Sequence, residues 1–212
     1  MRSDWKEIPF EHYACLFKEL KPFEAAHRTN IIFDEYKSAF LMRYFGKPCA
    51  IIHPKTDFIV EPEGEMLSIS EKILLLRYLC EGKWEASAGR RLSYREIPWG
   101  EVYYKNFEGR CLGRLARVFG GCPELFARVF EESPPFDVEK ITGKEYAYRF
   151  EFISNLYLSF QIWPGDDEFP ASAQILFDDN VCGFFSAEDL AVVCESLITR
   201  LKARAAALGT AA

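Results

Sequence analysis

Four carboxylates in the last quarter of the chain have residue types and spacing that could do chemistry. Asp166, Asp167 and Glu168 lie in one turn between Trp163 and Pro170, and Asp178 follows the next predicted strand. Carboxylate oxygens are preferred ligands of hard divalent cations, and carboxylates also act as general acids and bases. The acid-rich turn (residues 163–170) is therefore either a binding or catalytic site or a hairpin turn whose aspartates accept backbone N–H groups.

A second candidate site is an arginine stripe, Arg110, Arg114 and Arg117, whose spacing places three side chains on one face of a helix. The opposite face of that helix carries Leu112, Leu115, Ala116 and Phe119. Residues 90–117 hold seven Lys and Arg against three Glu, a local charge of +4. Guanidinium groups match carboxylates and phosphates, so the stripe suits a small anionic ligand or an acidic protein partner. The alternative is a solvated face that pairs with the protein's own carboxylates.

The sequence argues against histidine-based catalysis or metal binding and against the common kinds of nucleotide binding. The three histidines, His12, His27 and His53, lie in the first quarter of the chain, and no H-x-x-x-H or C-x-x-C spacing occurs. Cys49 and His53 flank two isoleucines on a presumed strand, which suits a core thiol and a turn histidine better than a nucleophilic pair. The G-x-S-x-G, P-loop and G-x-G-x-x-G motifs are also absent. We therefore expect no metal centre and no bound cofactor.

Charge and cysteine content narrow the class of partner and compartment. The net charge of −6 argues against binding nucleic acid over the whole surface. Seven cysteines with irregular gaps indicate reduced, mostly buried thiols, and the N-terminus lacks an apolar signal segment, so we expect a cytoplasmic protein. The longest stretch without Asp, Glu, Lys or Arg is the fourteen residues 152–165, too short to span a membrane.

The elements that must position these residues fit one domain over residues 1–212. Hydrophobic residues make up 49% of the chain, enough for a sizeable core. Hydrophobic periodicity predicts a helical lead-in over residues 1–30, strands over 40–44, 49–52 and 58–60, and a helix over 73–79 capped by Ser68 or Ser70.

The second half is predicted to combine helices and strands. We expect an ordered loop over 81–100, helices over 108–119 and 123–130, a hairpin of strands 146–152 and 156–162 with one apolar face, and a strand over 173–177. The last helix begins at the cap Ser186, Lys202 and Arg204 complement its dipole at the other end, and the tail 205–212 is expected to fray. The predicted fold class is α+β, an antiparallel sheet with the middle and C-terminal helices packed against it.

Several segments, in order along the chain, resemble a prokaryotic family of unknown function. They are residues 74–79, 93–98, 107–110, 115–120 and, above all, Gly-Asp-Asp-Glu-Phe-Pro at 165–170, Ile-Leu-Phe-Asp at 175–178 and Glu-Asp-Leu-Ala at 188–191. The resemblance covers roughly residues 40–201. It implies no assigned activity, and some members are joined to a small iron–sulphur cluster domain in anaerobic bacteria and archaea. This chain lacks a cysteine cluster that could hold such a centre, so the resemblance assigns no catalytic residue.

Two functional hypotheses remain. The first is a cytoplasmic, non-enzymatic binding or accessory protein, whose ligand or partner meets the acid-rich turn and the aromatic residues beside it; the absence of common catalytic motifs favours it. The second is a carboxylate-based enzyme that uses Asp166, Asp167, Glu168 and Asp178, with or without a divalent ion.

Overall fold

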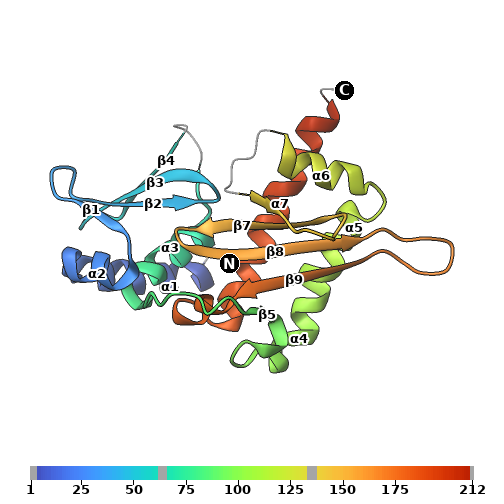
Figure 1. The fold of residues 1–212 in the computed structure, drawn as a ribbon. Coiled ribbons are helices and arrows are strands. Elements are labelled where there is room, and N and C mark those ends of the chain that lie inside the picture. The colour runs from blue at the N-terminus through green and yellow to red at the C-terminus, as the bar shows by residue number, and fades with distance from the viewer. Residues whose placement is uncertain (1–3, 62–65, 133–137, 211–212) are drawn as a thin grey trace.

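The computed structural model of the chain describes residues 4–61, 66–132 and 138–210 (Figure 1). The helices are α1 (Asp4–Lys18), α2 (Pro22–Thr29), α3 (Ile69–Glu81), α4 (Gly100–Phe107), α5 (Gly113–Phe119), α6 (Pro123–Glu131) and α7 (Ala187–Thr210). The strands are β1 (Ile32–Asp34), β2 (Ala39–Tyr44), β3 (Lys47–Ile52), β4 (Asp57–Val60), β5 (Arg91–Ser93), β6 (Val138–Lys140), β7 (Ala147–Ile153), β8 (Leu156–Trp163) and β9 (Ser172–Asp178).

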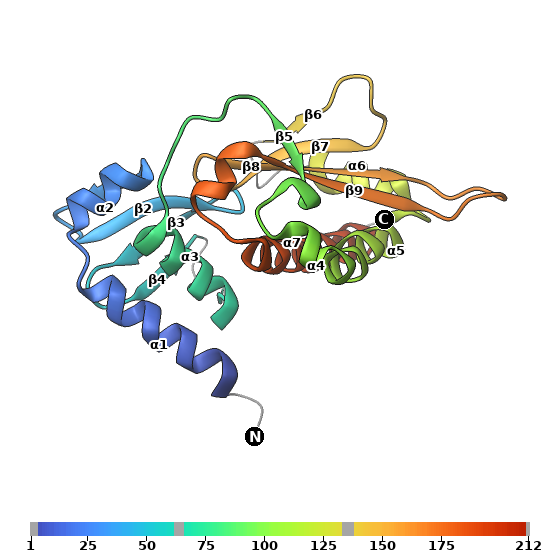
Figure 2. The ribbon, with the colours of Figure 1, turned by 90° about the horizontal axis from the view of Figure 1, so that it is seen from below.

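The strands of the described residues form one sheet in the order β4-β3-β2-β7-β8-β9-β5, with β1 on β2 and β6 on β7. Every pairing in it is antiparallel. Helices α4, α5 and α7 lie on one side of β7–β9 (Figure 2). The predicted α+β class, an antiparallel sheet with helices packed against it, is confirmed.

The core lies between the long strands and these helices. Tyr148, Phe150 and Phe160 alternate along β7 and β8, and all three side chains are fully buried. Phe130 of α6 stacks on Tyr148 with ring centroids 4.8 Å apart. Burial of each large apolar side chain contributes about 1.5–3 kcal/mol, and the buried apolar residues of the described chain, from Ala14 to Ala205, form one cluster.

The β7–β8 hairpin has the single apolar face that the sequence predicts, and its second face is charged and partly buried. Glu151 is 1% exposed and its Oε2 lies 2.5 Å from Nε of Arg43. Arg149 pairs with Asp178, Nη2 to Oδ2, at 2.5 Å. Opposite charges allow this face to be buried because each carboxylate has a cationic partner. Alternation alone cannot separate such a face from a solvated one.

The predicted loop over 81–100 contains a strand. β5 adds to the edge of the sheet, with Arg91 opposite Asp178 and Leu92 opposite Phe177. A short 3₁₀ turn, Tyr94–Glu96, then leads into α4. A strand of three residues is too short to show an alternating pattern, so its pairing with β9 is visible only in the fold.

The last helix begins where the sequence predicts and extends further. The backbone N–H of Ser186 donates to Oδ2 of Asp189 at 2.9 Å, and the N–H of Asp189 donates back to Oγ of Ser186 at 3.3 Å. α7 then continues to Thr210, so residues 205–210 of the expected frayed tail are helical. Ala205 is 5% exposed and anchors this end on the core. Residues 211–212 lie outside the described residues.

None of the helices in the described part of the chain has both the length and the apolar character needed to cross a membrane.

Candidate functional site

The acid-rich turn lies at the tip of the β8–β9 hairpin, which projects from the body of the molecule (Figure 1). Oδ1 of Asp166 accepts the backbone N–H of Phe169 at 2.7 Å and that of Glu168 at 2.9 Å. These hydrogen bonds, the one from Phe169 most of all, hold the pKa of Asp166 below its usual value. The carboxylate of Asp166 thus closes the turn, while Asp167 and Glu168 are exposed.

The structure does not bring the four predicted carboxylates together. Asp178 ends β9, whereas Asp166 precedes its start, and seven residues of strand separate the two ends by about 20 Å. Asp178 is instead 6% exposed and paired with Arg149, whose guanidinium also lies 4.0 Å from the centroid of the Tyr157 ring. Within the described residues, no group of three or more His, Cys, Asp or Glu side chains is placed to hold a metal ion.

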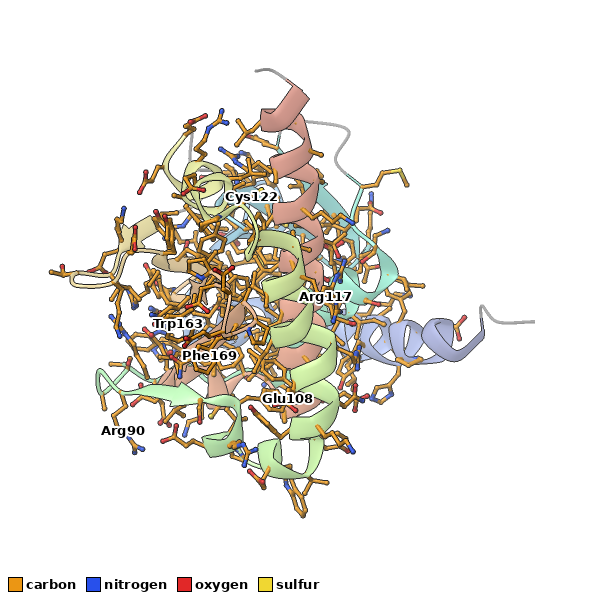
Figure 3. All side chains as sticks on the ribbon, turned by 90° about the vertical axis from the view of Figure 1, so that its right-hand side faces the viewer. Arg90, Glu108, Arg117, Cys122, Trp163 and Phe169 are labelled. Atoms are coloured by element: carbon orange, nitrogen blue, oxygen red, sulfur yellow. The ribbon has the colours of Figure 1, made fainter. Side chains whose placement is uncertain are left out.

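The aromatic residues beside the turn are solvent-accessible. Trp163 is 41% exposed and Phe169 is 67% exposed. Figure 3 shows both residues to one side of α5 and Arg117 to the other. The acid-rich turn and the arginine stripe therefore belong to two different surfaces.

The arginine stripe faces α7. Nε and Nη2 of Arg110 donate to the two carboxylate oxygens of Glu195 at 3.0 and 2.5 Å, and this hydrogen bonding raises the pKa of the guanidinium. Arg114 is half-buried and donates from Nη2 to Oγ1 of Thr199 at 3.0 Å and from Nη1 to the carbonyl oxygen of Glu195 at 3.4 Å. The charge of Arg110 is neutralised by Glu195, whereas the two acceptors of Arg114 within the described part of the chain are neutral.

A π-helical turn, Glu108–Leu112, joins α4 to α5 and sets the phase of this stripe. The turn closes with a hydrogen bond from the N–H of Gly113 to the carbonyl of Glu108, one residue longer than an α-helical bond. Leu115 and Phe119 are fully buried on the far side, as helical spacing predicts, while Leu112 is only partly buried. The π turn also buries Cys111, which the predicted apolar stripe omits.

Beyond Arg114, the two helices border a groove of about 630 Å³, here called the basic groove. Its lining residues are Arg114, Arg117, Val118, Leu125, Lys202, Ala205, Ala206 and Gly209. Arg117 and Lys202 are exposed, and none of the described residues that line the groove carries a carboxylate. The groove thus combines three cations with an apolar floor.

Lys202 also belongs to this site, although the sequence predicts for it only the role of complementing the dipole of the last helix. Glu195, Thr199 and Lys202 follow one another at intervals of four and three residues. Arg110, Arg114 and Arg117 have the same intervals, so two parallel helices can match them pair by pair. That shared spacing was the available signal, but only the fold shows that the two segments are neighbours.

An antiparallel sheet backed by helices, with a basic groove between two of them, defines an α+β protein with a candidate anion-binding site. The model of the family described as domain of unknown function (DUF3786) matches residues 21–200, so the chain belongs to this family. The resemblance is thereby confirmed at the level of an uncharacterised family. No curated protein and no solved structure matches the chain.

Proposed function

We propose that this protein is a non-enzymatic binding protein that holds a small anionic ligand in the basic groove. The anionic group, a phosphate or carboxylate, contacts Arg114, Arg117 and Lys202. An apolar portion of the ligand lies along Val118 and Leu125. Of the predicted arginine stripe, the proposed site includes Arg114 and Arg117 but not Arg110, and Lys202 is its third cation. In this proposal the ligand does not contact the acid-rich turn.

The pairing of α5 with α7 carries the proposal. Arg110 meets the carboxylate of Glu195 and Arg114 meets the hydroxyl of Thr199. Three residues further along each helix, Arg117 of α5 and Lys202 of α7 are both cations and line the same groove. Two like charges on one groove repel each other, and a bound anion would turn that repulsion into attraction.

The groove also has the composition of a ligand site. Hydrogen bonds from charged donors contribute about 1.5–3 kcal/mol each, and Arg and Lys are the usual donors to phosphate. Val118, Leu125 and Ala205 supply apolar surface beside them. A volume of about 630 Å³ lies within the range of small-molecule sites.

Calorimetry with octyl phosphate tests the proposal, because this probe joins a phosphate to a short apolar chain. We expect octyl phosphate to bind more tightly than inorganic phosphate or the neutral 1-octanol. Arg117→Gln and Lys202→Gln should each weaken binding about tenfold, the loss of one charge-assisted hydrogen bond. Binding should also weaken as salt rises.

Matched variants outside the groove serve as controls. Arg90 is exposed and lies away from Arg117 in Figure 3, and Lys55 is exposed in the turn between β3 and β4. Arg90→Gln and Lys55→Gln therefore remove the same charges outside the groove, and both variants should bind octyl phosphate as the wild type does. Equal weakening by all four variants would indicate a general charge effect and contradict the proposal. Binding of 1-octanol as tight as that of octyl phosphate would contradict it too.

The proposed location is the cytoplasm. All seven cysteines are free thiols in the structure, and three of them are buried, Cys49, Cys111 and Cys194. Cys15, Cys122 and Cys182 are exposed, so the prediction that most of the thiols are buried is wrong. Free thiols persist in reducing compartments, which supports this location. Because β9 separates Asp178 from Asp166 by about 20 Å, the four predicted carboxylates do not form one catalytic site, which favours the binding hypothesis.

A further inference from the structure

A second hollow, here called the Trp99 cleft, lies at the other end of the α4–α5 helical run. One wall consists of Pro98, Trp99, Val102 and Tyr103, and the other is the segment 182–188 that leads into α7. Its volume is about 730 Å³, larger than that of the basic groove. Glu188 and Lys202 are fourteen residues apart on α7, about 21 Å, so the two sites are separate.

Trp99 is held in this cleft in an unusual conformation. Its backbone φ is +66°, in the left-handed region that large side chains rarely adopt. The residue precedes α4 in a tight turn, where the N–H of Gly100 donates to the carbonyl of Ile97 at 2.8 Å. Its side chain is nevertheless 77% exposed, so core packing does not account for a tryptophan at this position.

Other apolar side chains extend the same wall. Val102 is 73% exposed and Tyr103 is 44% exposed, one helical turn from Trp99. Phe184 and Phe185 belong to the opposite wall of the cleft, and both side chains are nearly buried. The cleft therefore offers a ligand the exposed rings of Trp99 and Tyr103 and a small accessible part of Phe184.

The charges around the cleft are acidic. Glu81 and Glu188 are the charged residues among its described lining, which includes no Lys or Arg. Arg77, just behind, pairs with both Glu81 at 3.1 Å and Asp189 at 2.5 Å. Arg28 is a second cation near Glu81, since its guanidinium donates to the carbonyl oxygens of Leu79 and Gly82. Three carboxylates against two guanidinium groups leave one excess negative charge, and Glu188 has no ion-pair partner among the described residues.

We propose that the Trp99 cleft binds a small organic cation with a flat apolar body, such as an aromatic ammonium compound. The ammonium group lies against the face of Trp99 and near the carboxylate of Glu188, since tryptophan is the strongest cation–π acceptor. The body of the ligand packs on Tyr103 and Phe184. This site goes beyond the basic groove and carries the opposite charge preference.

Calorimetry with benzyltrimethylammonium, compared with the neutral benzyl alcohol, tests the charge preference. We expect the cation alone to bind, more weakly at high salt. Trp99→Leu and Glu188→Gln should each weaken its binding about three- to tenfold. The matched controls are Trp163→Leu and Glu168→Gln on the projecting hairpin, which remove the same groups at exposed positions and should change affinity less than about twofold.

Trp99→Gly separates a ligand-binding role from a structural one. Glycine adopts positive φ without strain, so this variant should keep or raise the melting temperature while losing the cation. A fall in melting temperature would assign Trp99 a structural role and contradict the proposal. Equal binding of benzyl alcohol, or unchanged binding by Glu188→Gln, would also overturn it, whatever octyl phosphate does at the basic groove.

Discussion

Arg117 and Phe119 are two residues apart but have opposite roles in the same helix. Phe119 is fully buried and meets the ring of Phe126 at 5.2 Å between centroids, whereas Arg117 is exposed on the basic groove. Phe119→Ala should lower the free energy of unfolding by about 3–5 kcal/mol, because a cavity remains in the core. Arg117→Gln should change it by about 0.5 kcal/mol or less.

Urea denaturation followed by circular dichroism measures both effects. Octyl phosphate binding should show the reverse pattern, lost in Arg117→Gln and retained by the folded fraction of Phe119→Ala. A large loss of stability in Arg117→Gln would mean that this side chain supports the helix rather than a ligand, contrary to the proposed role.

Individual residues differ in how far the sequence predicts their environment. The Asp-rich composition of the turn allowed both a site and a closed turn, and the hydrogen bonds of Asp166 match those of the closed turn. Asp178 was grouped with it by residue type, yet its partner is Arg149, twenty-nine residues away. A side-chain pair across strands depends on register, which local sequence does not specify.

Glu71 shows how one side chain joins elements. As the third residue of α3 it accepts the N–H of Ser68 at 2.8 Å, completing the capping box, and it accepts Nη2 of Arg200 on α7 at 2.7 Å. Burial alone would raise the pKa of Glu71, but the hydrogen bonds from Ser68 and Arg200 outweigh it and lower the pKa. Glu71 therefore links α3 to α7.

This link predicts a pH dependence of stability. A carboxyl group with a lowered folded-state pKa stabilises the protein above its unfolded pKa, near 4.3, and the contribution is lost as pH falls through the folded pKa. Glu71→Gln should reduce the free energy of unfolding by about 1–3 kcal/mol at pH 7. Urea titrations should show this difference shrinking below about pH 4. A difference that is the same at pH 7 and at the lowest pH reached would contradict the assignment.

Elements with a long periodic pattern were predictable, and short or irregular ones were not. The capped helix α3, the strands β7, β8 and β9 and the buried side of α5 follow from hydrophobic spacing. β1, β5 and β6 have three residues each, and their pairing comes from neighbouring strands. The π turn before α5 has no periodic signature, so the sequence predicted the apolar stripe but missed Cys111.

At the scale of the whole molecule, the candidate site arises from packing between remote segments. Arg110 and Glu195 are eighty-five residues apart in sequence and are brought together only by the helical layer over the sheet. The sequence identified the arginines as one face of a helix. The sequence could not show that α7 faces this helix, that a carboxylate of α7 neutralises Arg110, or that Lys202 of α7 lies in the same groove as Arg117.

The central claim is that the basic groove is the ligand site of this protein. Backbone amide NMR of the ¹⁵N-labelled protein, titrated with octyl phosphate at constant ionic strength, locates the contact directly. The account predicts that the largest shift changes occur at residues 114–118 of α5 and 202–206 of α7, and that they saturate. Changes concentrated at the acid-rich turn or the Trp99 cleft, or no saturable change at all, would contradict it.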